Sequence, residues 1–91
     1  MYEIRVTSRF KKDLKAAQKQ GRDLTLLRAV ITKLSNGEIL APKYRDHALT
    51  GDWADFRECH IMPDWLLIYK QDKDILILTL VRNGTHSDLF R

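Results

Sequence analysis

The chain has 91 residues, which suffices for one domain, and we expect this single domain to span residues 1–91. A chain of this length buries only about 60 to 65% of its unfolded surface, which excludes a large internal cavity and leaves a shallow groove as the form of any active site. Sixteen Lys and Arg against twelve Asp and Glu give a net charge of +4. This balance favours polyanionic partners, and we expect no small-molecule ligand.

The sequence indicates a cytoplasmic protein. No apolar stretch approaches the roughly 20 residues that a membrane-spanning helix requires, and the first residues lack the features of a signal peptide. Cys59 is the only cysteine, so an internal disulfide is impossible, which agrees with a reducing compartment. We interpret Cys59 as a packed strand residue rather than a nucleophile, because a lone cysteine on a strand usually serves packing.

The first third of the chain predicts a strand followed by a helical hairpin. Residues 2–7 alternate apolar and polar side chains, which is typical of a strand with Tyr2, Ile4 and Val6 on a core. Thr7 or Ser8 can cap a helix over residues 9–19, Gly21 ends it, and Asp23 can cap a second helix. The apolar stripes at helical spacing are Phe10, Leu14 and Ala17 in the first helix, and Leu24, Leu27, Val30, Ile31 and Leu34 in the second.

Four lysines form a basic ridge on the first helix. Lys11, Lys12, Lys15 and Lys19 fall within roughly 100° of arc, away from the apolar stripe. Such a ridge is either a solvated face or a surface that contacts phosphates, and the sequence leaves both interpretations open.

The remaining residues predict three strands. Residues 38–52 form a long polar connection, and strands follow from about residue 56 to 61, from 65 to 70 and from 74 to 82, separated by turns at 62–64 and 71–73. Near the end of the sequence we expect a single helical turn, whose Leu89 and Phe90 dock on the sheet. The fold class is therefore α+β, in the order β-α-α-β-β-β, with the helices on one face of a mostly antiparallel sheet of about four strands.

Three histidines are the first candidates for catalysis. His47 lies in the long connection, His60 at a strand end beside the turn that holds Asp64, and His86 just past the last strand. An antiparallel sheet can bring these places to one rim, and histidine exchanges protons near neutral pH. Each histidine taken alone is more often structural than catalytic.

The spacing of possible ligands argues against a metal site. Cys59 and His60 are consecutive on a strand and point to opposite faces, and the sequence contains neither HxxxH nor CxxC. We expect no metal and no cofactor.

Cleavage of RNA through its ribose 2'-hydroxyl fits these residues without a cofactor. One group accepts the hydroxyl proton, another protonates the leaving 5'-oxygen, and cations stabilise the charge that builds on the phosphate. Trp65 and Phe90 are candidates for contacting unstacked bases and Arg82 for contacting the phosphate. The structural alternative for Trp65 is a core tryptophan.

Three separated segments, DHALTGDW, FRECHIMPDWLLIYK and GTHSDLF, resemble the signature segments of YafQ-type toxins in the RelE/ParE superfamily of toxin–antitoxin systems. The resemblance spans the chain, including the FKKDLKAAQKQG helix. It implies a ribosome-dependent messenger RNA endonuclease that cuts within codons, adenine-rich lysine codons in the type member, and that a cognate antitoxin holds inactive. The ribosome, messenger RNA and the antitoxin are thus the expected partners.

The resemblance also implies roles for seven residues. The implied catalytic set is His47, His60, Asp64 and His86, with Trp65, Phe90 and Arg82 placing the substrate. We assign Asp64 or His60 as the base, His86 as the acid, and His47 as an orienting or second acid–base group. Two alternatives stay open: a ParE-like toxin that binds DNA gyrase and cleaves nothing, and a basic module that binds RNA or antitoxin without catalysis.

Overall fold

The computed structural model describes residues 1–90, which form an α+β domain as predicted. Its elements in chain order are β1 (Glu3–Val6), α1 (Ser8–Lys19), α2 (Leu24–Ser35), the 3₁₀ turn η1 (Pro42–Tyr44), β2 (His47–Ala48), the 3₁₀ turn η2 (Gly51–Trp53), β3 (Arg57–Met62), β4 (Trp65–Asp72), β5 (Ile77–Gly84) and α3 (His86–Phe90). Arg91, the last residue of the expected domain, lies outside the described residues.

The sheet has five strands in the order β1-β5-β4-β3-β2. Strands β2 to β5 pair antiparallel and β1 pairs parallel to β5, so the expectation of a mostly antiparallel sheet is confirmed. The expected number of four strands was one too low. His47 and Ala48, which we expected in a connection, pair with Glu58 and Arg57 as the short strand β2.

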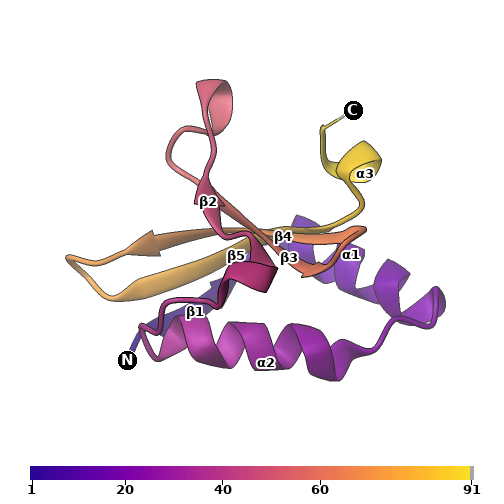
Figure 1. Cartoon of the computed structure of the whole chain (residues 1–91), viewed down its shortest axis with the longest axis horizontal. Coiled ribbons are helices and arrows are strands. Elements are labelled where there is room, and N and C mark those ends of the chain that lie inside the picture. The colour runs from indigo at the N-terminus through magenta and orange to yellow at the C-terminus, as the bar shows by residue number, and fades with distance from the viewer. Residues whose placement is uncertain (91) are drawn as a thin grey trace.

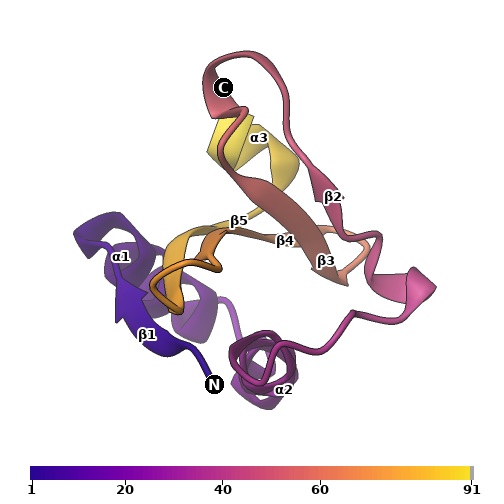
Figure 2. The same ribbon diagram turned by 90° about the vertical axis from the view of Figure 1, so that its left-hand side faces the viewer.

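The two helices form the predicted hairpin and cover one face of the sheet (Figures 1 and 2). The Thr7 hydroxyl accepts the Phe10 N–H at 3.0 Å and caps α1, and the Asp23 carboxylate accepts the Thr25 N–H at 3.0 Å and caps α2. Gly21 has φ +77°, a left-handed conformation that favours glycine and lets the chain leave α1. Both predicted apolar stripes pack into the core between the helices and the sheet.

Strand β1 departs from the expected burial. Ile4 is 45% exposed and Val6 is 40% exposed, although the alternation predicted both on the core. The reason is the place of β1 at the sheet edge, where it pairs only with β5. An edge strand has a neighbour on one side alone, so an alternating sequence does not ensure that its apolar face is covered.

A second, smaller apolar cluster lies on the opposite face of the sheet. Leu66 and Ile68 of β4 pack there with Leu89 of α3, and Trp53 and Phe90 pack against them. Figure 1 shows α3 on the side of the sheet away from α1 and α2. The predicted docking of Leu89 and Phe90 on the sheet is therefore confirmed, and α1 and α2 lie on the other face.

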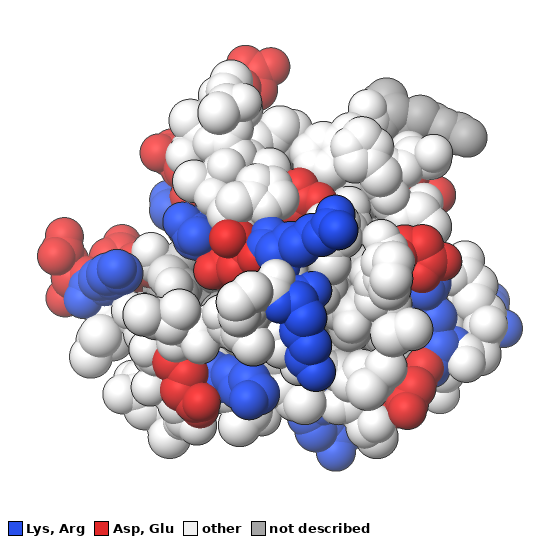
Figure 3. Space-filling model, viewed as in Figure 1, with Lys and Arg blue, Asp and Glu red and all other residues white. Residues whose placement is uncertain are grey.

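The charged surface is uneven. Figure 3 shows basic side chains crossing the middle of one face, around the level of η1 and between β2 and α2. The four lysines of the α1 ridge are all exposed. No helix among residues 1–90 is long and apolar enough to cross a membrane.

The buried Cys59 thiol and Tyr69 hydroxyl predict that the protein loses stability at alkaline pH. Burial, with a smaller contribution from the Asp46 and Glu58 carboxylates, raises the pKa of the Cys59 thiol to about 12 from 9.0. Burial and a hydrogen bond to Asp46 also raise the pKa of Tyr69 above its usual 10.0. The unfolded chain then releases protons at lower pH than the folded chain, so the free energy of unfolding falls as pH rises above about 9.

Urea unfolding at pH 8 and pH 11 measures this effect. We expect the free energy of unfolding to fall by about 2 to 4 kcal/mol between the two, and the Cys59→Ala variant to show a shallower decline. Equal stability of the native chain at both pH values would contradict the burial argument.

Candidate active site

The four residues expected to carry the chemistry line one hollow on the face opposite α1 and α2. His47 comes from β2, His60 from β3, Asp64 from the β3–β4 turn and His86 from the first position of α3. The hollow has a volume of about 490 Å³ and is open to solvent. The sheet thus brings together residues that lie up to 39 positions apart between His47 and His86 in the sequence.

Glu58 joins two of the histidines and was not among the predicted site residues. Its carboxylate lies 3.5 Å from Nε2 of His47 and 3.8 Å from Nε2 of His60, and its side chain is only 8% exposed. Glu58 is directly opposite His47 in the register of β2 and β3. The sequence signalled only the nearness of Glu58 to His60, because alternation places both on the same strand face.

Backbone carbonyls fix the other nitrogen of both rings. Nδ1 of His47 donates to the Arg45 carbonyl at 2.7 Å, and Nδ1 of His60 donates to the Pro63 carbonyl at 3.3 Å. A carbonyl oxygen only accepts, so each Nδ1 carries its proton. Each ring is therefore held from one side by a carbonyl and presents Nε2 toward the Glu58 carboxylate.

Hydrogen bonds to the Asp46 carboxylate fix β2 against the sheet. Asp46, next to His47, accepts two hydrogen bonds from Arg57 at 3.3 Å and a hydrogen bond from the Tyr69 hydroxyl. Because Arg57 and Tyr69 lie on β3 and β4, the carboxylate ties the short strand to two long ones. His47 consequently has a fixed position although β2 has only two residues.

Asp64 lies at the mouth of the hollow. Its side chain is 74% exposed, and one carboxylate oxygen pairs with Arg22 at 3.5 Å. Arg22 lies in the connection between α1 and α2, and its guanidinium lies 5.2 Å from the centre of the Trp65 ring. The Arg22 guanidinium therefore lies between the Trp65 ring and the Asp64 carboxylate. It pairs with one oxygen of Asp64, and the second oxygen is outside this ion pair.

His86 stands on a short capped helix. The Asp88 N–H donates to the Thr85 hydroxyl and the Thr85 N–H donates to the Asp88 carboxylate, both at 3.2 Å, which forms a reciprocal cap at the start of α3. The His86 ring packs on Phe90 at 4.9 Å between centroids, and Phe90 contacts Trp53 edge-on at 5.7 Å. Within residues 1–90 the exposed His86 ring makes no hydrogen bond.

Trp65 and Arg82 lie away from the hollow. Trp65 is 1% exposed and donates its indole N–H to the buried Asn83 side chain at 3.2 Å, so its ring belongs to the core. The Arg82 guanidinium makes two hydrogen bonds of 3.1 Å to Asp13 of α1. These placements leave neither side chain facing the histidines.

Comparison with known proteins assigns a family to this arrangement. The family model described as the bacterial toxin of type II toxin–antitoxin systems, YafQ, matches residues 2–91. The mRNA interferase toxin YafQ of Escherichia coli strain K12 is 41% identical over 90 residues, which cover 97% of this chain and 95% of the relative.

Solved structures agree with the sequence comparison. A metal-bound toxin from Helicobacter pylori has a TM-score of 0.93 and 50% identity, covering 99% of this chain and 100% of the other. YafQ in the E. coli DinJ–YafQ complex has a TM-score of 0.91 and 38% identity, with 100% of both chains covered. This chain therefore belongs to the YafQ family of bacterial toxins of type II toxin–antitoxin systems.

Proposed function

We propose that this toxin is a cytoplasmic messenger RNA endonuclease that cuts within codons on the translating ribosome. One observation carries the proposal: four potential proton carriers and a buried carboxylate surround a single solvent-open hollow. The likeness to the mRNA interferase toxin YafQ of E. coli supports the same reaction class. The hollow is shallow, so a 91-residue enzyme gains from a ribosome that positions the message for it.

The proposed reaction is an internal displacement at phosphorus. The ribose 2'-hydroxyl loses its proton to a base and its oxygen bonds to the phosphorus, while the bond from phosphorus to the 5'-oxygen breaks. The departing 5'-oxygen takes a proton from an acid. The products are a 2',3'-cyclic phosphate and a 5'-hydroxyl, and no cofactor enters.

The hydrogen-bond partners assign the base. Both nitrogens of His60 already face acceptors, namely the Pro63 carbonyl and the Glu58 carboxylate. Asp64 instead presents a carboxylate oxygen to solvent at the mouth of the hollow. Asp64 is therefore the base in this proposal, and His60 joins His47 in placing the phosphate.

His86 is the proposed acid. Its ring is exposed, and Phe90 supports one face of it at 4.9 Å, so the nitrogens remain available to a leaving oxygen. Phe90 has the further proposed role of contacting a base of the substrate. Trp65 and Arg82 have a positioning role in this proposal. Their hydrogen bonds to Asn83 and Asp13 fix the start of β4 and the end of β5, which lie next to the site.

The proposed partners are a cognate antitoxin, the ribosome and messenger RNA. An E. coli relative has been solved as the DinJ–YafQ toxin–antitoxin complex, which supports an antitoxin for this chain. An H. pylori relative has been solved with metal bound. Within residues 1–90 of this chain no group of three or more His, Cys, Asp or Glu side chains is placed to hold a metal ion.

Primer extension on a message translated in a purified system tests the proposed function. We expect cuts in codon register when ribosomes are present and very slow cutting of the same RNA without them. Cleavage should persist in 1,10-phenanthroline, which removes transition metals and leaves Mg²⁺ for the ribosome. An intact message, together with loss of DNA gyrase supercoiling, would contradict the proposal in favour of a ParE-like toxin.

Glu58 gives the proposal a residue-level test. Replacing Glu58 with glutamine keeps its shape but removes the charge that faces both Nε2 atoms, and misplacing catalytic groups costs up to about a hundredfold in rate. We expect Glu58→Gln to cleave ten to a hundred times more slowly than the native toxin at unchanged antitoxin affinity. Glu38→Gln, the same change at an exposed position before η1, is the matched control. Equal cleavage rates for the two variants would show that the charge of Glu58 does not contribute to catalysis.

A further inference from the structure

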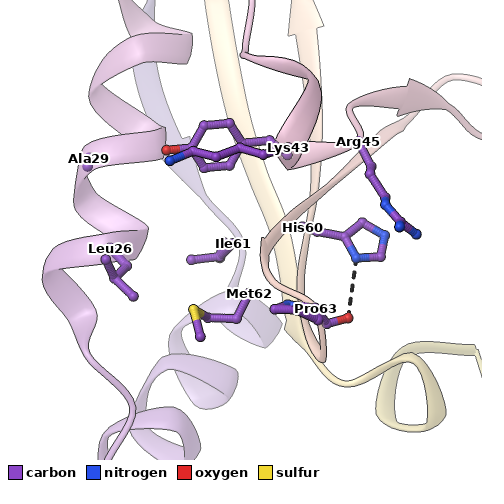
Figure 4. A pocket seen from close by; sticks show the side chains of 9 residues that line it. Leu26, Ala29, Lys43, Arg45, His60, Ile61, Met62 and Pro63 are labelled. Carbon is purple, nitrogen blue, oxygen red and sulfur yellow. Dashed lines mark hydrogen bonds between the residues drawn. The ribbon is translucent and has the colours of Figure 1, made fainter.

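A second groove adjoins the catalytic hollow. It has a volume of about 470 Å³ and runs between α2 and the β3–β4 hairpin. Figure 4 shows Leu26 and Ala29 of α2 on one side of it, with Ile61 and Met62 on the other. The proposed reaction gives no role to the apolar side chains of this groove.

The walls of the groove are apolar and partly open to solvent. Leu26 is 39% exposed and Met62 is 43% exposed, and Leu26 lies outside the apolar stripe that packs α2 onto the core. The fold does not require an apolar side chain at either position. Both side chains are therefore available to a ligand with flat apolar faces.

The groove and the catalytic hollow meet. His60 and Pro63 line both, so a chain lying across the hollow continues directly into the groove. Figure 4 shows Arg45 and His60 on the side of the groove away from α2. Arg45 is also the residue whose carbonyl holds His47, so its position is tied to the catalytic site.

Two cations line the end of the groove that η1 forms. Lys43 and Arg45 are exposed and belong to the groove lining, and the Lys43 ammonium lies 5.1 Å from the centre of the Tyr44 ring. Apolar walls beside exposed cations match an unpaired nucleotide, whose base has apolar faces and whose phosphate is charged.

We propose that this groove binds the base next to the cleaved bond of the RNA, between Leu26 and Met62, with Lys43 and Arg45 on its phosphate. The inference rests on the proposed function, because it takes the scissile phosphate to lie over His60. Continuity with the catalytic hollow favours RNA over a docked protein segment as the occupant. The groove then selects the base that the enzyme accepts beside the cut.

Binding of an uncleavable RNA tests the groove independently of cleavage. The probe is a single-stranded decaadenylate with 2'-O-methyl riboses, titrated against the 15N-labelled toxin. We expect shifts of the Ala29, Tyr44 and Met62 amide signals and about tenfold weaker binding to Met62→Asp and to Leu26→Asp, because a carboxylate in the groove repels the neighbouring phosphate and disfavours the apolar face of the base. Ile75→Asp, at an exposed apolar residue of the β4–β5 turn, is the matched control and should bind as the native toxin does.

The outcomes separate this inference from the proposed function. Groove shifts and weakened Met62→Asp binding without any cleavage of translated messages would show that RNA binds in the groove, but would refute the endonuclease and with it the assignment of the groove to the base beside a cut. Normal cleavage with unshifted groove signals, and equal RNA binding by native, Met62→Asp and Leu26→Asp toxins, would overturn the groove alone. Variants that bind RNA normally but lose the antitoxin would identify the groove as a protein-docking surface and overturn the inference as well.

Discussion

Replacement of His86 by alanine is expected to reduce the rate of messenger RNA cleavage by about 10²- to 10⁴-fold, the contribution of a positioned acid. The ring is exposed on α3 and packs mainly on Phe90, so its loss leaves the core unchanged. We expect the thermal midpoint of the variant to stay within about 2 °C of the native value. Primer extension measures the rate, and circular dichroism measures the midpoint.

Antitoxin binding is the control for His86→Ala. A catalytic role predicts that the variant binds the cognate antitoxin with native affinity while it no longer cuts. A variant that still cuts at the native rate would show that the leaving oxygen obtains its proton elsewhere. Loss of antitoxin binding along with cleavage would indicate that α3 had lost its position.

Replacement of Asp13 by alanine is expected to cost about 3 kcal/mol of unfolding free energy. Asp13 accepts two hydrogen bonds from Arg82 and one from the Asn83 N–H, and the side chains of Asp13 and Arg82 are 14% and 15% exposed. The change leaves the Arg82 charge in a largely buried place without its partner. Arg82 also donates to the Asp88 carbonyl at 3.5 Å, so α3 loses a contact with β5 and we expect cleavage to fall as well.

Two further variants isolate the Asp13 effect. Replacing both partners, with Asp13→Ala and Arg82→Met together, removes the unpaired charge and should restore much of the stability. Glu3→Ala breaks the exposed Arg5–Glu3 pair and should cost less than about 1 kcal/mol. Urea unfolding measures all three. A loss below about 1 kcal/mol for Asp13→Ala would contradict the buried ion pair.

Local patterns predicted the helical hairpin well. Thr7 and Asp23 cap their helices through contacts with residues two or three positions away, and Gly21 ends α1 through its own backbone conformation. Such features depend on neighbours in the chain. The burial of Ile4 was predicted wrongly, because the place of β1 at the sheet edge depends on its parallel pairing with the distant β5.

In the candidate site, too, some features follow from local sequence patterns and others depend on pairing between distant parts of the chain. The gathering of His47, His60 and His86 followed from strand ends that an antiparallel sheet brings together. Glu58 was missed as a partner because its contact with His47 depends on the short strand β2, which the polar sequence there did not indicate. Arg82 lies beside Asp13, 69 positions away, and no sequence pattern reveals a pair at that separation.

The chemical identity of the cut ends tests the central claim most directly. Attack by the ribose 2'-hydroxyl, with Asp64 as base and His86 as acid, predicts a 2',3'-cyclic phosphate on one fragment and a 5'-hydroxyl on the other. Mass spectrometry of a short translated message cut by the toxin distinguishes these ends, and a 2'-deoxy substitution at the cut site should abolish cleavage there. Fragments with 3'-hydroxyl and 5'-phosphate ends would show that water is the nucleophile and would contradict the account.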